Sequence, residues 1–285
     1  MTPNYPETTK GSNAQTAAER LAEFIQAHPR LFVLTGAGVS TDSGIPDYRD
    51  TNGAWKRKQP VQHDAFMGSE AVRQRYWGRS LIGWPVVRNA RPNPAHRALA
   101  ELEKLTPMSR LVTQNVDRLH QQAGSQRVVD LHGRADQVIC MDCGYRCARD
   151  AVHERCAELN PGFSQLSATS APDGDADLDV DFGRFRIANC PHCDGILKPD
   201  VVFFGDFVPN QRVMSAREAL EKSDALLVVG SSLMVYSGFR FCRYARDWGL
   251  PIATLNRGRT RADEFVSLKL DAAIGDTLTD MLERL

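Results

Sequence analysis

The stretch LFVLTGAGVS, residues 31–40, decides the fold class of this chain. Its first five residues are an apolar run, which is typical of a strand buried on both faces of a sheet. Gly36, Ala37 and Gly38 follow directly, and glycines there let the backbone approach a pyrophosphate closely. The third glycine of the usual dinucleotide fingerprint is replaced by Thr41. The stretch predicts a strand ending at a phosphate-binding turn, and a tight turn with only a structural role would have the same pattern.

Outward from this stretch, short apolar runs alternate with segments of helical spacing. Helices are predicted at residues 17–27, 94–105, 211–222 and 239–248, and strands at 109–113, 225–229 and 251–255. Such alternation indicates an α/β fold, with a parallel sheet covered by helices on both faces. Ligands of these sheets bind beyond the carboxyl ends of the strands. Four of the predicted strands end there in polar or glycine-rich clusters, which favours a ligand-binding protein over a purely structural one.

Two segments interrupt this alternation. Residues 134–197 contain two cysteine pairs, and within them 160–181 is a predicted loop rich in Ser, Pro, Gly and Asp. Residues 43–91 hold three of the four tryptophans and have mixed helical character. We therefore expect a discontinuous α/β domain at 14–42, 92–133 and 198–285, a helical insertion carrying a cofactor loop at 43–91, and a metal-binding module at 134–197. Residues 1–13 are expected to be disordered.

Composition excludes several classes of function. The 285 residues are 42% hydrophobic and 25% charged, with a formal net charge of zero, as in an ordinary soluble globular protein. We expect no direct binding to nucleic acid or to anionic membranes, because such binders usually carry a basic excess. The longest apolar runs are too short to span a bilayer, and the first 20 residues lack a secretory signal. We expect a cytoplasmic protein and favour a monomer.

Four of the seven cysteines form two Cys-x-x-Cys pairs, Cys140 with Cys143 and Cys190 with Cys193. In a chain without an export signal, this spacing indicates metal binding before it indicates disulfides. Four thiolates close a tetrahedral shell and leave no position for water, so the predicted zinc ion is structural. The alternative is four unrelated buried thiols. The other three cysteines have no partner at ligand spacing and are expected to be packed or surface thiols: Cys147, Cys156 and Cys242.

Polar side chains follow the predicted strand at 109–113. Gln114, Asn115 and Asp117 stand at its carboxyl end, and His132 stands between Leu131 and Gly133 just before the metal module. A histidine with a pKa near neutrality can serve as a general base. A lone histidine can equally be a structural hydrogen-bonding residue.

These pieces occur in one order, and that order resembles the sirtuin family. The matching segments are residues 36–40, 43–49, 92–96, 113–117, 131–133, the two cysteine pairs, 198–206, 230–232 and 255–256. Within the family, residues 76–79, 83–85, 171–175 and 235–238 are most similar to class II, which includes the mitochondrial lipoamidase-type sirtuin. Three positions depart from the common pattern, since Tyr48, Lys198 and Asp206 stand where many members have Phe, Arg and Glu.

The resemblance implies a Rossmann-like sheet domain and an NAD-dependent protein lysine deacylase. Acyl-lysine and NAD would meet in a cleft between the sheet domain and the zinc module, and the acyl group would pass to ADP-ribose with release of nicotinamide. His132 would act as general base on the ribose hydroxyls, and Asn115 and Gln114 would orient the ribose. Asp117 and the backbone near Ile45 would hold the nicotinamide amide.

The resemblance also implies the remaining contacts. NAD would be held by Gly36, Ala37, Gly38, Ser40, Ile45, Pro46, Asp47, Tyr48, Arg49, Gln114, Asn115, Val116, Asp117, Gly230, Ser231, Ser232, Asn256, Arg257, Gly258 and Ile274. The substrate peptide would add as a strand beside Val202, Phe204, Gly205, Asp206, Val235 and Tyr236.

Tyr76 and Arg79 resemble a pair that recognises acidic acyl groups in the desuccinylase class of sirtuins. We therefore expect a preference for an acyl chain other than acetyl, with Arg79 forming a two-pronged bond to a carboxylate. In the alternative, Arg79 is a surface residue and Tyr76 packs in the helical insertion. Trp77 and Trp84 would then suit a longer apolar chain such as lipoyl.

Three other functions share part of the pattern. An NAD-dependent dehydrogenase would need the full glycine fingerprint and would gain nothing from a closed zinc site. A mono-ADP-ribosyltransferase cleaves the same bond of NAD and is the nearer alternative. A binding protein built on the zinc module, without catalysis, is disfavoured by the polar strand ends and the neutral charge.

Overall fold

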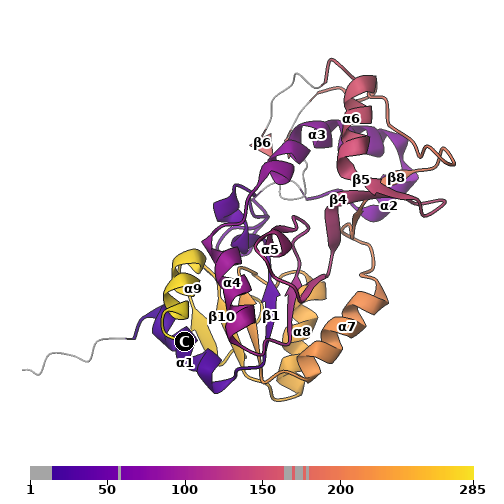
Figure 1. The fold of residues 1–285 in the computed structure, drawn as a ribbon. Helices are drawn as coiled ribbons and strands as arrows, with labels where there is room; N and C mark the ends of the chain where they lie inside the picture. The colour runs from indigo at the N-terminus through magenta and orange to yellow at the C-terminus, as the bar shows by residue number, and fades with distance from the viewer. Residues whose placement is uncertain (1–14, 57–58, 164–168, 171–175, 178–179) are drawn as a thin grey trace, which may run out of the picture.

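A large parallel sheet forms the base of the molecule (Figure 1). The computed structural model describes residues 15–56, 59–163, 169–170, 176–177 and 180–285, so the N-terminal segment predicted to be disordered lies outside the described residues. The sheet has six strands in the order β11-β10-β9-β1-β2-β3. Numbered one to six along the chain and read from the β3 edge, the order is 3-2-1-4-5-6, which is the order of the Rossmann fold. The predicted Rossmann-like sheet is confirmed.

The strand bounds agree closely with the apolar runs. The strands are β1 (Leu31–Thr35), β2 (Arg110–Thr113), β3 (Val128–Asp130), β9 (Ala225–Val229), β10 (Ile252–Leu255) and β11 (Leu268–Leu270). Sequence patterns did not predict β3 and β11, which are three residues long and carry too few apolar positions to show a period.

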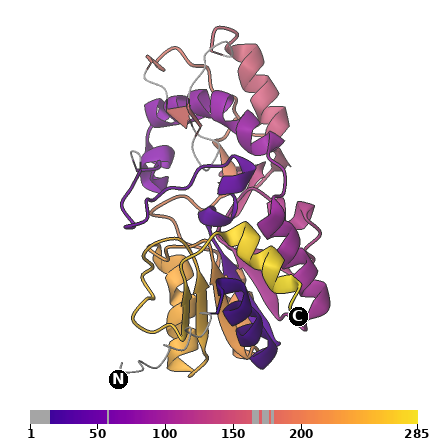
Figure 2. The same ribbon diagram turned by 90° about the vertical axis from the view of Figure 1, so that its left-hand side faces the viewer.

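Helices cover both faces of this sheet (Figures 1 and 2). One face packs against α1 (Ala17–Ala27), α4 (Pro94–Leu105) and α9 (Ile274–Leu282), and the other against α7 (Asn210–Glu221) and α8 (Tyr236–Asp247). Side chains of β1 alternate between the two layers. Leu31 and Val33 join the first core, whereas Phe32 and Leu34 join the second. A strand buried on both sides must therefore be apolar throughout, as β1 is.

Local sequence explains where two of these helices begin. The Thr16 hydroxyl accepts a hydrogen bond from the Glu19 N–H at 3.2 Å, and the Glu19 carboxylate accepts one from the Thr16 N–H at 2.8 Å. This capping box satisfies two N–H groups that the first turn of α1 leaves free. Asn93 caps α4 by accepting from the Ala95 N–H at 2.9 Å, and Pro94 occupies the first helical position.

A smaller part sits above the carboxyl edge of the large sheet (Figure 1). It contains an antiparallel sheet of β4 (Gly133–Cys140), β5 (Arg146–Ala148) and β8 (Leu197–Val201), with α6 (Arg149–Leu159). The helical insertion supplies α2 (His63–Gly68) and α3 (Glu70–Asn89). The segment predicted as a loop contains two short paired strands, β6 (Thr169–Ser170) and β7 (Ala176–Asp177). The expected module boundary at residue 197 falls inside β8.

The remaining short helices are η1 (Ala37–Val39), η2 (Thr41–Ser43) and α5 (Leu119–Gln122). None of the helices within the described ranges is long and apolar enough to cross a membrane.

A buried arginine lies between the helical insertion and the metal module. Arg149 is 1% exposed, and its guanidinium carbon lies 4.9 Å from the ring centre of Trp77 and 5.2 Å from that of Trp84. Its Nη2 donates to Ser80 Oγ, whereas Nε and Nη1 find no hydrogen-bond partner in the described structure. Cation–π contacts of about 2 kcal/mol are offset by unsatisfied donors at about 1–3 kcal/mol each.

These opposing contributions predict different outcomes for two substitutions. Arg149→Met fills the same space without unsatisfied donors, so we expect its free energy of unfolding to lie within about 1 kcal/mol of wild type or above it. Arg149→Ala leaves a cavity and should lie about 2–5 kcal/mol below the methionine variant. Urea denaturation of the three proteins measures both differences. A methionine variant as unstable as the alanine variant would show that the guanidinium itself stabilises the fold.

Candidate active site

The carboxyl ends of the central strands open into a cleft of about 690 Å³. Its walls come from the loops after β1, β2, β9 and β10 below, and from α3 and the segment after β8 above. The cleft brings together almost all of the NAD and substrate contacts predicted from the sequence. Of those residues, Pro46, Gly258 and Arg79 do not contribute to its lining.

Two loops meet tightly at the floor of the cleft. The Gly36 N–H donates to the Val229 carbonyl at 3.1 Å, and the Gly38 N–H donates to the Gly230 carbonyl at 2.9 Å. A Cβ on Gly36 would lie 2.8 Å from that same Gly230 oxygen, which no side chain tolerates. The glycines thus serve the contact between the loops as well as an open cleft floor. Two single-turn helices, η1 and η2, come directly after β1, where the usual fingerprint has a longer helix.

A polar network follows at the end of β2. The Ser40 hydroxyl donates to Asp117 Oδ2 at 2.7 Å, and Asn115 Nδ2 donates to Ser40 Oγ and to the Gly36 carbonyl, each at 3.0 Å. Asp117 Oδ1 accepts from the Leu119 N–H at 2.9 Å. Burial raises the pKa of the Asp117 carboxyl, although both hydrogen bonds oppose the shift. This hydrogen-bonded cluster thus joins residues that are at least 75 positions apart in the sequence.

The segment 92–96 supports this cluster from behind. Asn93 Nδ2 donates to the Val39 carbonyl at 2.7 Å and to Ser43 Oγ at 3.0 Å, while its Oδ1 caps α4. His96 Nε2 lies 3.4 Å from Ser40 Oγ, and burial lowers the pKa of His96 to about 4. Both side chains are buried and act as scaffold for the glycine loop.

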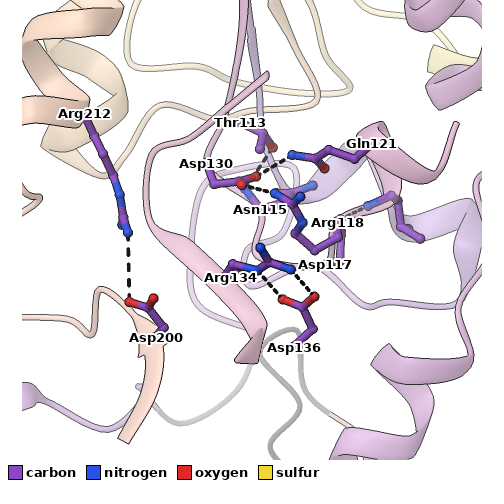
Figure 3. A network of polar contacts seen from close by, with 11 residues as sticks. Thr113, Asn115, Asp117, Arg118, Gln121, Asp130, Arg134, Asp136, Asp200 and Arg212 are labelled. Carbon is purple, nitrogen blue, oxygen red and sulfur yellow. Dashed lines mark hydrogen bonds and ion pairs between the residues drawn. The ribbon is translucent and has the colours of Figure 1, made fainter. Parts of the chain in front are cut away.

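The loop after β2 is held by charged contacts around Asp130 (Figure 3). Arg118, which has a φ of +67°, forms an ion pair with Asp130, and Gln121 Nε2 donates to the same carboxylate at 2.9 Å. These contacts join the loop to β3 and keep Asn115 and Asp117 facing the cleft.

His132 lies in the cleft wall, and each of its ring nitrogens has a hydrogen-bond partner. Nδ1 lies 3.0 Å from the Gln114 carbonyl, which can only accept, so Nδ1 carries the proton. Nε2 lies 2.7 Å from Ser237 Oγ and therefore accepts. Burial, with repulsion from Arg212 and Arg240, lowers the pKa of His132 to about 4. The imidazole is thus neutral at pH 7, with its basic nitrogen in the cleft.

The upper wall is aromatic. Tyr76 is 2% exposed and packs with ring centres 5.3 Å from both Phe66 and Phe203. Arg79 is half-buried on the same helix and lies outside the cleft lining, so the structure does not bring the two side chains into one pocket.

The lining also contains residues that the sequence did not identify as contacts, among them Trp55, Phe207, Ser237 and Arg240. Ser237 lies inside a quoted class-specific segment, yet nothing in its spacing indicated a contact with His132. Phe207 is 90% exposed, and its place directly after Gly205 and Asp206 of the predicted peptide edge was the sequence signal that could have identified it.

The four cysteine sulfurs gather within 4.8 Å of one another. Cys140 Sγ lies 3.5 Å from Cys193 Sγ, and Cys143 Sγ lies 3.7 Å from Cys190 Sγ. A tetrahedral zinc with Zn–S bonds of about 2.3 Å requires sulfur separations of about 3.8 Å. The arrangement fits a closed structural zinc site, and four unrelated thiols would not converge in this way.

A family model described as the Sir2 family matches residues 36–237, which is more than half of the chain. The chain belongs to the Sir2 family. This sirtuin is 59% identical over 259 residues to an NAD-dependent protein deacetylase of Xanthomonas campestris pv. campestris, covering 90% of this chain and 88% of that protein. It is 49% identical over 264 residues to the mitochondrial NAD-dependent protein lipoamidase sirtuin-4 of Bos taurus, covering 91% and 84%.

Solved structures agree with this assignment. A complex described as Sir2 with a p53 peptide and NAD⁺ matches with a TM-score of 0.75 at 26% identity, covering 93% of this chain and 97% of that chain. Sir2Tm bound to a propionylated peptide matches with a TM-score of 0.74 at 26% identity, covering 93% and 96%. The protein is therefore an NAD-dependent protein deacylase, and the dehydrogenase and non-catalytic alternatives are set aside.

The cysteine cluster predicts one zinc ion per chain. Cys190→Ser removes one thiolate, so we expect zinc content to fall well below one per chain and the thermal unfolding midpoint to drop, because structural zinc supplies folding free energy. Cys242→Ser, at a buried thiol outside the cluster, is the control and should keep its zinc. Metal analysis by mass spectrometry measures the zinc content of both variants, and thermal denaturation measures their unfolding midpoints. Unchanged zinc in the Cys190 variant would contradict the assignment.

Proposed function

We propose that His132 is the general base of the deacylation reaction and that the cluster around Ser40, Asn115 and Asp117 holds the nicotinamide riboside end of NAD. The observation that supports this most directly is the neutral imidazole of His132, with Nε2 in the cleft and Nδ1 on the Gln114 carbonyl. A general base must be unprotonated and within hydrogen-bond reach of the group it deprotonates.

Different parts of the cleft would bind different parts of NAD. Asn115 has both amide protons engaged by the Gly36 carbonyl and Ser40, which leaves its Oδ1 to accept from a ribose hydroxyl. Asp117 and the backbone near Ile45 would bind the nicotinamide amide. The loops at Gly230–Ser232 and Asn256–Arg257, with Ile274, would contact the adenosine half. NAD supplies the ribosyl carbon that receives the acyl oxygen.

Arg49 would face the phosphates from the upper loop. Its guanidinium carbon lies 3.9 Å from the ring centre of Trp55, and its Nη1 donates to the Gly53 carbonyl at 2.7 Å. The loop is fastened to the far side of the cleft, because the Arg259 N–H donates to the Thr51 carbonyl at 2.8 Å. A stacked arginine retains further donors for an anion, which suits pyrophosphate recognition.

If His132 is the general base, its removal should lower the rate of product formation, and kcat/KM should depend on pH in a defined way. His132→Ala should lower formation of acyl-ADP-ribose by about 10²–10⁴-fold while NAD binding persists. In wild type, the neutral imidazole is the active form and its pKa is about 4. The value of kcat/KM, which reports the free enzyme, should therefore stay level as pH falls through 6.5 and decline only towards pH 4.

The pH profile of kcat/KM needs a control for unfolding, because acid also destabilises the protein. Histidines whose pKa is lowered by burial bind protons more readily when unfolded, so the fold loses stability as pH falls from about 6.5 towards 4. Circular dichroism at each pH identifies the range in which the protein stays folded. Activity of His132→Ala within about threefold of wild type, or an acid limb near pH 6.5, would contradict the proposed role.

We further propose that the preferred acyl chain is longer than acetyl and apolar. Tyr76 belongs to an aromatic cluster at the cleft wall, whereas Arg79, Trp77 and Trp84 stand outside the lining. The aromatic wall around Tyr76, and not the two tryptophans, therefore favours an apolar chain over recognition of a carboxylate by Arg79. The likeness to a relative named as a lipoamidase points the same way. The substrates would be acyl-lysine proteins, and a cytoplasmic location and a monomeric state stay predictions.

Competition kinetics test the acyl preference. With acetyl, succinyl, glutaryl and lipoyl versions of one lysine peptide, we expect lipoyl to have the highest kcat/KM, because a longer apolar chain buries more surface. Arg79→Met should leave the ranking unchanged. A highest value for acetyl would contradict the preference, and a succinyl preference abolished by Arg79→Met would restore the carboxylate-binding role. Nicotinamide release without any acyl-lysine would instead favour mono-ADP-ribosyl transfer.

A further inference from the structure

Ser237 forms a hydrogen bond with His132, the proposed base, and neighbouring residues hold the two side chains in place. Its hydroxyl lies 2.7 Å from Nε2 of His132, and both residues line the cleft. The Gln114 carbonyl on Nδ1 completes a chain of hydroxyl, imidazole and orienting acceptor. This is the arrangement in which a histidine withdraws a proton from a hydroxyl.

Helix α8 holds the serine in this position. Ser237 lies in its first turn, and the next residue, Gly238, packs directly on Gln114. A Cβ on Gly238 would lie 2.4 Å from Gln114 Oε1, so a side chain at this position would displace the Gln114 amide. The same residue, Gln114, therefore orients His132 through its carbonyl and seats Ser237 through its side chain.

The chemistry of the imidazole limits how a substrate can reach it. A neutral imidazole with its proton on Nδ1 has one lone pair, on Nε2, and Ser237 occupies it. The hydroxyl of Ser237 can itself accept a hydrogen bond while it donates one. A substrate hydroxyl in the cleft can thus join the chain at Ser237 Oγ without displacing any contact.

We propose that Ser237 is a catalytic proton relay between the ribose hydroxyl and His132. The ribose O–H bond breaks and its proton passes to Ser237 Oγ, while the Ser237 proton passes to Nε2 of His132. The ribose oxygen keeps the bonding electron pair, His132 becomes an imidazolium, and Ser237 ends as a neutral hydroxyl. This inference rests on the proposed role of His132 as base.

Matched variants separate the hydroxyl from the shape of the side chain. Ser237→Thr keeps a hydroxyl, whereas Ser237→Val has the same branching without one. We expect the threonine variant to form acyl-ADP-ribose within about threefold of wild type, and the valine and alanine variants to lose at least about tenfold, below the full effect of losing the base. Ser223→Ala is the control, since Ser223 donates to the Ala219 carbonyl at 2.7 Å, before β9 and away from the cleft.

Two further readouts exclude a merely structural role. In the nucleotide-free protein, the ¹⁵N resonance of His132 Nε2 should move towards the value of a free acceptor in the valine and alanine variants and stay unchanged with threonine. Exchange of labelled nicotinamide into NAD, in the presence of acyl peptide, should persist in all Ser237 variants, because the relay acts after nicotinamide has left.

The outcomes distinguish two failures. Valine and threonine variants of equal activity, or an unmoved Nε2 resonance in the valine variant, would overturn the relay while His132→Ala remains inactive. Full product formation by His132→Ala would overturn the proposed base itself. Loss of nicotinamide exchange in the valine variant would show that Ser237 acts in binding or folding, which also overturns the relay.

Discussion

Everything at the active site depends on the close approach of two loops, those that leave β1 and β9. These strands are neighbours in the sheet, and their connections run to opposite faces, which opens a crevice at their carboxyl ends. Gly36 and Gly230 let the two backbones come within hydrogen-bond distance. A side chain at either position would push the loops apart and would displace Ser40, Asn115 and Asp117 together, because their hydrogen bonds connect to this contact.

A second constraint is the burial of two ionisable groups at the cleft. Burial raises the pKa of Asp117 and lowers the pKa of His132, so each shift favours the neutral form. The neutral imidazole needs no counterion, and Arg212 and Arg240 nearby reinforce its neutrality. At rest, His132 therefore carries its single proton on Nδ1, and Nε2 accepts a hydrogen bond from the Ser237 hydroxyl.

The smaller part of the molecule supplies the roof of the cleft, and its stability comes from different sources. Its three-stranded sheet carries a four-cysteine site that fits zinc, and its contact with α3 is built around aromatic rings and the buried Arg149. A structural zinc ion contributes folding free energy in addition to this apolar packing. The roof holds Tyr76 and the segment after β8 at the cleft with an apolar core of its own, separate from the two cores of the large sheet.

The sequence by itself determined the Rossmann-like sheet, because strands buried on both faces must be apolar throughout, as β1 and β9 are. It also determined the four zinc ligands, since Cys-x-x-Cys pairs have a fixed local geometry, and the residues that line the cleft floor, which follow strand ends. Only the tertiary structure decided that Ser237 contacts His132 across 105 positions, that Arg79 stays outside the cleft lining, and that the glycines serve a contact between loops. Local sequence patterns indicate which face of a helix or strand is buried. Contacts between side chains that are distant in the sequence depend on how the elements pack together, and hydrophobic periodicity does not indicate that packing.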